Sequence, residues 1–144
     1  MTKNEYKNMN IHLENFKQFI QQREKAAKAY ICGNPTPVLD LTTQVSPATF
    51  FSPRGDFQQG AEDVLSKFTQ DAKNFCPGGD THFEIFDIAA DTNLAYWVGL
   101  QKANVLMHGK IDSITMNLRI TEIFRRENNE WKLVHRHADF LNIP

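Results

Sequence analysis

The sequence predicts a single α+β domain in which helices pack on one face of an antiparallel sheet. Two segments in the first half carry apolar residues at helical spacing, whereas the second half alternates like a series of strands separated by turns. Helices that precede such a meander are typical of α+β domains. A chain of 144 residues has the length of one domain. We expect residues 1–9 to form a frayed extension and residues 10–144 to form the domain.

Two amphipathic helices are expected before the sheet. The first runs from about Asn10 to Ile31, where apolar side chains mark one face and charged residues fill the gaps. Gly33 directly after it is a typical C-terminal stop. The second helix is predicted over 60–75, and one short helical turn over 37–41. These helices can cover only one face of a sheet.

Strands are predicted over 45–51, 81–89 and 94–107, and the segment 114–140 is expected to form a closing hairpin. The long strands carry apolar side chains on both faces, so both faces need cover. The helices cover one face, and a second copy of the same sheet is the simplest way to cover the other face. We therefore expect a homodimer that forms through the outer face of the sheet.

Composition excludes several classes of function. The formal charge of -1 offers no general attraction to nucleic acid or to an anionic membrane. No segment has the roughly 20 apolar residues of a membrane span, and the N-terminus lacks the apolar run of a signal peptide. Cys32 and Cys76 are expected to be free thiols in a reducing compartment. We expect a soluble, cytoplasmic protein without a cofactor.

The closing hairpin carries the residues that suggest chemistry, and its register depends on the turn. On a regular last strand, one face would carry Trp131, Leu133, His135, His137 and Asp139. A two-residue turn at 128–129 would place Glu122 opposite His135, whereas a three-residue turn at 127–129 would place Thr121 there. One residue of slip moves a whole set of side chains to the other face, and the pattern leaves both registers open.

A resemblance covers nearly the whole chain. The order of elements, the Ser52–Gly55 segment (S-P-x-G), Arg119-x-Thr121 and the segment 131–137 (W-K-L-V-H-R-H) resemble the nuclear-transport-factor-2-like superfamily. That superfamily includes SnoaL-like proteins, ketosteroid-isomerase-like proteins and the association domain of calcium/calmodulin-dependent protein kinase II. The segment 131–137 is most similar to that association domain and to its bacterial stand-alone relatives.

The resemblance implies a cystatin-like, cone-like roll: a strongly bent antiparallel sheet with the N-terminal helices packed on its concave face. A pocket would lie inside the cone, and the outer face would pair in a dimer. The resemblance also favours the three-residue turn, with Arg119 and the two histidines pointing into the pocket.

The candidate site follows from these expectations. His135 and His137 are the candidate catalytic residues, because histidine titrates near neutral pH. Arg119 would bind a carboxylate through its planar fork. The other candidate ligand-binding residues are Thr121, Trp97, Tyr30, Phe51 and Asp139. The ligand would be a small apolar or carboxylate-bearing molecule.

Structural roles for the same residues are the alternative. The histidines could form part of the wall with their hydrogen bonds made to neighbouring residues, and Arg119 could pair with Asp139. The aromatic residues could be ordinary members of the hydrophobic core. The spacing of His135 and His137 could chelate a metal ion, but no companion ligands carry suitable spacing, so no metal site is predicted.

The ketosteroid isomerase mechanism itself is not expected here. That mechanism uses an aspartate base with tyrosine and protonated aspartic acid as donors. In the family, the base directly precedes the proline of the segment that here reads Ser52-Pro53, and a lone hydroxyl cannot abstract a proton at neutral pH. The family's tyrosine would fall near Ala26, and Tyr30 lies one turn later.

Two hypotheses therefore remain. The first is a homodimeric small-molecule-binding protein with an apolar conical pocket, such as an isomerase- or cyclase-like enzyme that transfers a proton without a cofactor. The second is an association module without chemistry.

Overall fold

The computed structural model describes residues 1–142, and of residues 8–10 only the backbone. The helices are α1 (Lys3–Ile31), α2 (Thr36–Leu41) and α3 (Ala61–Ala72). The strands are β1 (Thr49–Phe51), β2 (Phe57–Gln59), β3 (Phe75–Ala90), β4 (Leu94–Met107), β5 (Ile114–Thr115), β6 (Leu118–Glu127) and β7 (Glu130–Phe140). The predicted α+β class is confirmed. The last two residues of the predicted domain, 143 and 144, lie outside the described residues.

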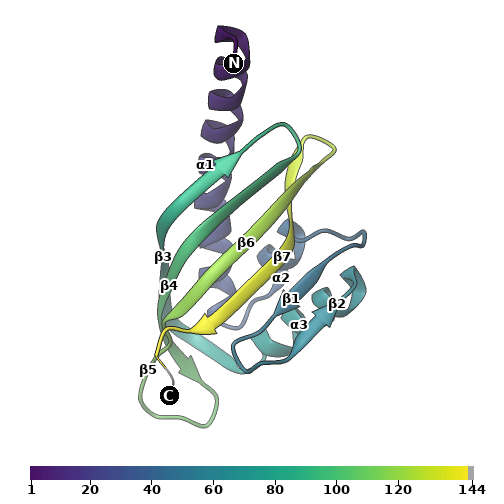
Figure 1. Ribbon diagram of the computed structural model, residues 1–144. Helices are drawn as coiled ribbons and strands as arrows, with labels where there is room; N and C mark the ends of the chain where they lie inside the picture. The colour runs from purple at the N-terminus through teal and green to yellow at the C-terminus, as the bar shows by residue number, and fades with distance from the viewer. Residues whose placement is uncertain (143–144) are drawn as a thin grey trace.

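The strands form one seven-stranded, strongly curved sheet. Its order is β2-β1-β7-β6-β4-β3, and β5 pairs with β4. The pairing of β1 with β7 is parallel, whereas the other strand pairs are antiparallel. In Figure 1 helix α1 runs behind the bent sheet, and α3 lies beside β1 and β2. This arrangement confirms the predicted cone-like roll with helices on one face.

Helix α1 begins earlier than the sequence analysis predicted. Thr2 caps it with a capping box, in which the Thr2 side chain accepts from the backbone of Glu5 and the Glu5 side chain accepts from the backbone of Thr2. The helix is therefore defined from Lys3 rather than from about Asn10. Its first turns project beyond the β3–β4 turn (Figure 1).

The core lies between the helices and the concave face of the sheet. On β4 the inner face carries Trp97 and Val105, each 0% exposed. Phe16 of α1 packs edge-on against Phe124 and Trp131, with ring centroids 5.2 and 5.4 Å apart. These aromatic contacts fix α1 across β6 and β7.

Strand β3 departs from the predicted pattern at both its start and its middle. It begins at Phe75, so the Pro77–Gly79 segment lies within the strand, at an irregular pairing between Cys76 and Asp80. A second irregularity separates Ile85 from Asp87. Beyond it Ile88 pairs with Trp97 on the inner face, which it shares with Phe83, whereas regular alternation would place Phe83 and Ile88 on opposite faces.

The closing hairpin has a two-residue turn and a β-bulge. Asn128 and Asn129 have φ angles of 50° and 65°, and Glu127 pairs with Glu130. Positive φ at both central residues is the requirement of a type I′ turn. The three-residue turn favoured by the resemblance is therefore wrong.

The bulge in β7 then decides which side chains face inward. Phe124 pairs with Leu133, but Ile123 pairs with His135, so Val134 has no opposite residue. Because a bulge inserts one residue, it reverses the alternation beyond it. Leu133 points into the core with only 2% exposure, while His135 and the alternate residues after it point outward. The predicted shared face of Trp131 and the two histidines is wrong for this reason.

Within residues 1–142, no helix combines the length and the apolar character needed to cross a membrane.

The turn gives a first prediction. Asn128→Ala and Asn129→Ala should each lower the free energy of unfolding by about 1 kcal/mol, because left-handed backbone is costly for residues with a Cβ and no local polar group. Asn129→Gly should be neutral or stabilising, since Asn-Gly is the preferred pair for this turn. Urea denaturation of the three variants measures these changes. Equal destabilisation by Ala and Gly at position 129 would contradict the turn assignment.

Candidate functional site

A cavity of about 140 Å³ opens between α1, α3 and the concave face of the sheet. Most of its wall is apolar, and the larger apolar residues in the wall include Ile31, Phe50, Phe68, Phe75, Leu118 and Phe140. One group of polar side chains in the wall consists of Arg23 and Tyr30 from α1, Gln101 from β4 and Arg136 from β7. The other polar residues of the wall are Ser52, Arg54, Lys67, Asp71 and Asn74. This combination of an apolar wall with a few convergent polar groups is typical of a small-molecule site.

The polar groups are organised around one buried carboxylate, Glu122, which is 0% exposed. Arg23 donates to it through Nε at 3.1 Å and Nη2 at 2.8 Å. Arg136 Nη1 donates at 2.8 Å, and Trp97 Nε1 donates at 2.9 Å. Arg136 also donates through Nη2 to Gln101 Oε1 at 2.7 Å. The network thus joins α1, β4, β6 and β7.

Glu122 is ionised in this network. Burial by itself would raise the pKa of Glu122, but the charges of Arg23 and Arg136, with their hydrogen bonds, lower that pKa to about 2. Two guanidinium groups facing one carboxylate leave a net charge of one positive unit in the interior. A buried charge without a counterion is costly, so the cluster favours the approach of an anion.

One donor of this cluster is still free. Arg23 is 2% exposed, and its Nη1 atom is buried without a hydrogen-bond partner within the described residues. Most buried donors in native structures are paired, so an unpaired guanidinium nitrogen on a side chain that lines a cavity suggests a ligand. The free nitrogen belongs to a side chain that lines the cavity.

Tyr30 supplies a second donor to the same cavity. Its ring packs against Phe68 and Phe75, with centroids 5.9 and 5.7 Å away. Burial, and after it the charge of Asp71, raise the pKa of the Tyr30 phenol, an effect that Arg136 and Arg23 only partly oppose. The phenol therefore keeps its proton at neutral pH and can donate a hydrogen bond.

A charged group of α3 also lines the cavity. Lys67 Nζ lies 3.3 Å from Asp71 and 3.1 Å from Asp56. Burial raises the pKa of the Asp71 carboxyl, and Lys67 opposes this rise. Asp71 is therefore a candidate proton carrier beside the apolar wall, opposite in charge to the arginines.

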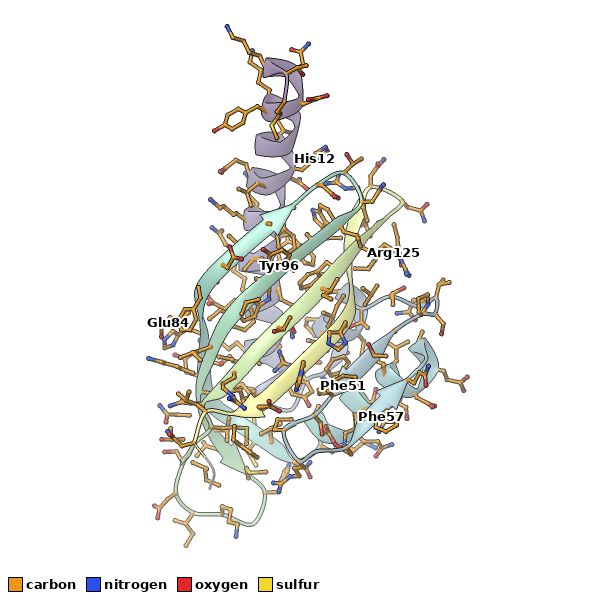
Figure 2. All side chains as sticks on the ribbon, viewed as in Figure 1. His12, Phe51, Phe57, Glu84, Tyr96 and Arg125 are labelled. Atoms are coloured by element: carbon orange, nitrogen blue, oxygen red, sulfur yellow. The ribbon has the colours of Figure 1, made fainter. Side chains whose placement is uncertain are left out.

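Most of the site residues predicted from sequence lie elsewhere. His135, His137, Arg119, Thr121 and Asp139 are on the outer face of the sheet, together with Phe51. Arg119 Nη2 pairs with Asp139 Oδ2 at 3.1 Å, as the structural alternative anticipated, and its side chain is 61% exposed. Figure 2 shows Phe51 and Tyr96 on this near face of the sheet. The expected orientation of Arg119 and the histidines toward the pocket is wrong.

The two histidines are held by neighbours on the outer face. His135 Nδ1 lies 2.6 Å from Thr49 Oγ1, and His137 Nε2 lies 3.2 Å from Asp139 Oδ1. Burial, and after it the neighbouring His137, lower the pKa of His135. Among the predicted residues, Tyr30 lines the cavity, and Trp97 lies behind it as a donor to Glu122.

Sequence reasoning missed Arg23, Gln101, Glu122 and Arg136, yet two of them carried a signal. Arg23 lies on the apolar stripe of α1, three residues after Ile20. Glu122 lies on the same strand face as Ile120 and Phe124. Charged residues are almost never fully buried unless they are paired, so a charge inside an apolar stripe points to a buried partner.

Fold and site together define the class of protein. A curved, mainly antiparallel sheet closed on one side by N-terminal helices, with a pocket inside, is the nuclear-transport-factor-2-like cone fold. The chain matches the SnoaL-like domain over residues 24–142, which is most of its length. The chain therefore belongs to the SnoaL-like family.

Solved structures confirm the fold. A nuclear transport factor 2-like superfamily protein from Salmonella enterica superposes with a TM-score of 0.74 at 13% identity, covering 90% of this chain and 91% of that one. A proposed dehydratase of this family from Streptomyces avermitilis gives a TM-score of 0.68 at 17% identity, covering 90% and 98%. A proposed calcium/calmodulin-dependent protein kinase type II association domain from Thiobacillus denitrificans gives 0.66 at 11% identity, covering 84% and 93%.

These identities are low, so the likenesses show the fold alone. No curated protein matches the chain.

The buried network gives a second prediction. Glu122→Gln should lower the free energy of unfolding by about 3–5 kcal/mol, because it leaves two guanidinium groups buried without their counterion. Glu130→Gln on the exposed end of β7 is the control and should change little. Chemical denaturation at neutral pH measures both. A loss below about 1 kcal/mol for Glu122→Gln would be inconsistent with a buried, ionised Glu122.

The pKa of Glu122 gives a third prediction. Because this pKa is about 2 in the folded chain and 4.5 in the reference state, the ionised group contributes stability above pH 4.5. That contribution is lost as the pH falls from 4.5 to about 2. The difference in unfolding free energy between the native chain and Glu122→Gln should therefore be constant from pH 5 to 7 and shrink below pH 4.5. Denaturation curves across this range test the sign, and a difference that grows in acid contradicts it.

Proposed function

We propose that this protein binds a small molecule with an apolar body and a carboxylate or carbonyl oxygen, in the cavity between α1, α3 and the sheet. The unpaired Nη1 atom of Arg23 carries the proposal. It lies in a cluster with one excess positive charge, and Tyr30 adds a second donor to the same cavity. The role of anion clamp that the sequence suggested for Arg119 is here assigned to Arg23 and Arg136.

The size and lining of the cavity support a small ligand. An apolar cavity of about 150 Å³ holds a benzene-sized molecule, and the cavity here is of similar volume, about 140 Å³. The aromatic rings of Phe50, Phe68 and Phe75 offer apolar contact to such a body. A monocyclic aromatic carboxylate such as benzoate therefore fits as a first probe.

The cavity is also suited to proton transfer in a reaction of the isomerase or dehydratase type. Tyr30 remains a hydrogen-bond donor, and the Asp71 carboxyl has a raised pKa beside the apolar wall. An enzyme of this kind needs a positioned acid or base and a donor for developing negative charge on oxygen. In this proposal Asp71 moves the proton, and Arg23 with Tyr30 stabilises the oxygen.

The two-copy assembly expected from the sequence is the second part of the proposal. The outer face of the sheet exposes Phe51 on β1 by 39% and Ile123 on β6 by 36%. Ile123 lies between β4, which carries Val98 and Leu100, and β7, which carries the two histidines. A second copy of the same face would cover these side chains. The open cavity favours ligand binding over a purely structural role. The exposed outer face supports the alternative role as an association module.

Benzoate binding tests the clamp. The native chain should bind benzoate more tightly than the neutral benzamide, because only the carboxylate offsets the excess positive charge, as measured by calorimetric titration. Arg23→Lys keeps the charge but loses the free nitrogen, so it should weaken binding by about 10–100-fold, the equivalent of one charge-assisted hydrogen bond.

Arg119→Lys is the matched control, since it makes the same chemical change on the outer face. It should leave benzoate binding unchanged. If Arg119→Lys lost benzoate binding while Arg23→Lys kept it, the anion would bind to Arg119 on the outer face, and the proposal would be refuted.

Assembly has its own test. Ile123→Lys places a charge within the outer face and should convert a dimer into monomers, as measured by sedimentation equilibrium. Ile111→Lys, at a position that is 97% exposed between β4 and β5, is the matched control and should leave the assembly intact. A native chain that sediments as a monomer, or a dimer that survives Ile123→Lys, would contradict the outer-face pairing.

A further inference from the structure

A second polar constellation lies on the outer face of the sheet, away from the cavity. Beyond the bulge at Val134, His135 and His137 both point outward, two residues apart on β7. Their ring centroids are 6.5 Å apart. The ring of Phe51 on β1 lies against both, with centroids 5.1 and 5.4 Å away. The pair is therefore packed on one side and open to solvent on the other.

Each imidazole has one nitrogen engaged and one nitrogen free. His135 Nδ1 bonds Thr49 Oγ1 at 2.6 Å, which leaves Nε2. His137 Nε2 bonds Asp139 Oδ1 at 3.2 Å, which leaves Nδ1. Histidine ligands of metals commonly donate their other ring nitrogen to a carboxylate, a backbone carbonyl or water, which fixes the tautomer and the ring orientation. The contacts with Thr49 and Asp139 can serve this purpose in the tautomers that carry the proton on His135 Nδ1 and His137 Nε2.

The spacing of the rings is somewhat larger than that around a shared metal ion. Two imidazoles that bind one ion at about 2.0–2.1 Å in a tetrahedral arrangement have centroids about 5 Å apart. The observed 6.5 Å is larger, so the rings do not face a common ion as they stand. Rotation of both side chains toward each other would have to close this gap before the two free nitrogens could bind one ion.

We propose that His135 and His137 chelate a first-row divalent cation on the outer face, with Asp139 orienting the His137 ring and solvent completing the coordination. Imidazole nitrogen prefers Cu²⁺, Ni²⁺ and Zn²⁺ over the hard cations. Within residues 1–142 there is no cluster of three or more potential metal ligands, so this is a two-point site. The sequence pattern predicted no metal site because companion ligands are missing, and this proposal departs from that prediction.

This proposal is independent of ligand binding in the cavity, because the two sites lie on opposite faces of the sheet. The metal site and the proposed dimer contact would lie on the same face of the sheet. An ion held by one chain would give a stoichiometry of one ion per chain, and an ion shared by two copies would give one-half ion per chain. Either value supports chelation by the two histidines.

The competing site among the described residues is Cys76 with His108. The Cys76 Sγ atom lies 3.4 Å from His108 Nδ1, in the exposed region where β3 and β4 meet. A thiolate and an imidazole could also hold a soft divalent ion. The experiment must separate this pair from the histidines of β7.

The test is calorimetric titration of the untagged full chain with Ni²⁺ and with Cu²⁺. His135→Gln and His137→Gln should each weaken binding at least tenfold, and Asp139→Asn should weaken it by about 10-fold or more through loss of the orienting contact. His82→Gln, at an exposed position on β3, and Cys76→Ser are the controls and should bind like the native chain.

Native affinity in both His135→Gln and His137→Gln would overturn the proposal, as would loss of binding in Cys76→Ser. Circular dichroism of each variant separates a loss of ligand from a loss of fold.

Discussion

The structure depends on the buried ion cluster at Glu122. A single carboxylate receives donors from α1, β4 and β7 while it lies on β6 itself, so it links the helix layer to the middle of the sheet. The cost of burying this charge is offset only because Arg23, Arg136 and Trp97 all donate to it. The same network leaves an excess positive charge, and it leaves Arg23, a residue that lines the cavity, with one buried guanidinium nitrogen that has no hydrogen-bond partner within the described residues. The contact that fixes the helix also provides the polar end of the candidate binding site.

The bulge at Val134 makes this cluster possible. Without the extra residue, the alternation of β7 would carry Arg136 to the outer face and the two histidines into the cone. With it, Arg136 reaches Glu122 and Gln101, and the histidines meet Thr49 and Asp139 on the other side. One inserted residue therefore assigns the binding site and the outer-face histidines to opposite sides of the sheet.

Much of the fold could be predicted because it follows from periodicity. The apolar stripe of α1, the inner position of Trp97 and the α+β order all appear in the sequence pattern and in the structure. The site could not be predicted in the same way. A bulge changes no residue type, so the pattern from Trp131 to His137 reads as one continuous strand. Arg23 was visible as a charge in an apolar stripe, but its partner Glu122 lies 99 residues away and is brought near only by the tertiary fold.

The most direct test of this account is an NMR titration of the Glu122 side-chain carboxyl carbon. The shared ion cluster predicts that Glu122 remains ionised through the mildly acidic range and titrates only at about pH 2. Titration near the ordinary value of 4.5 or above would mean that Arg23 and Arg136 do not hold this carboxylate. In that case the bulge would not place Arg136 inward, and the proposed binding site would lose its polar end.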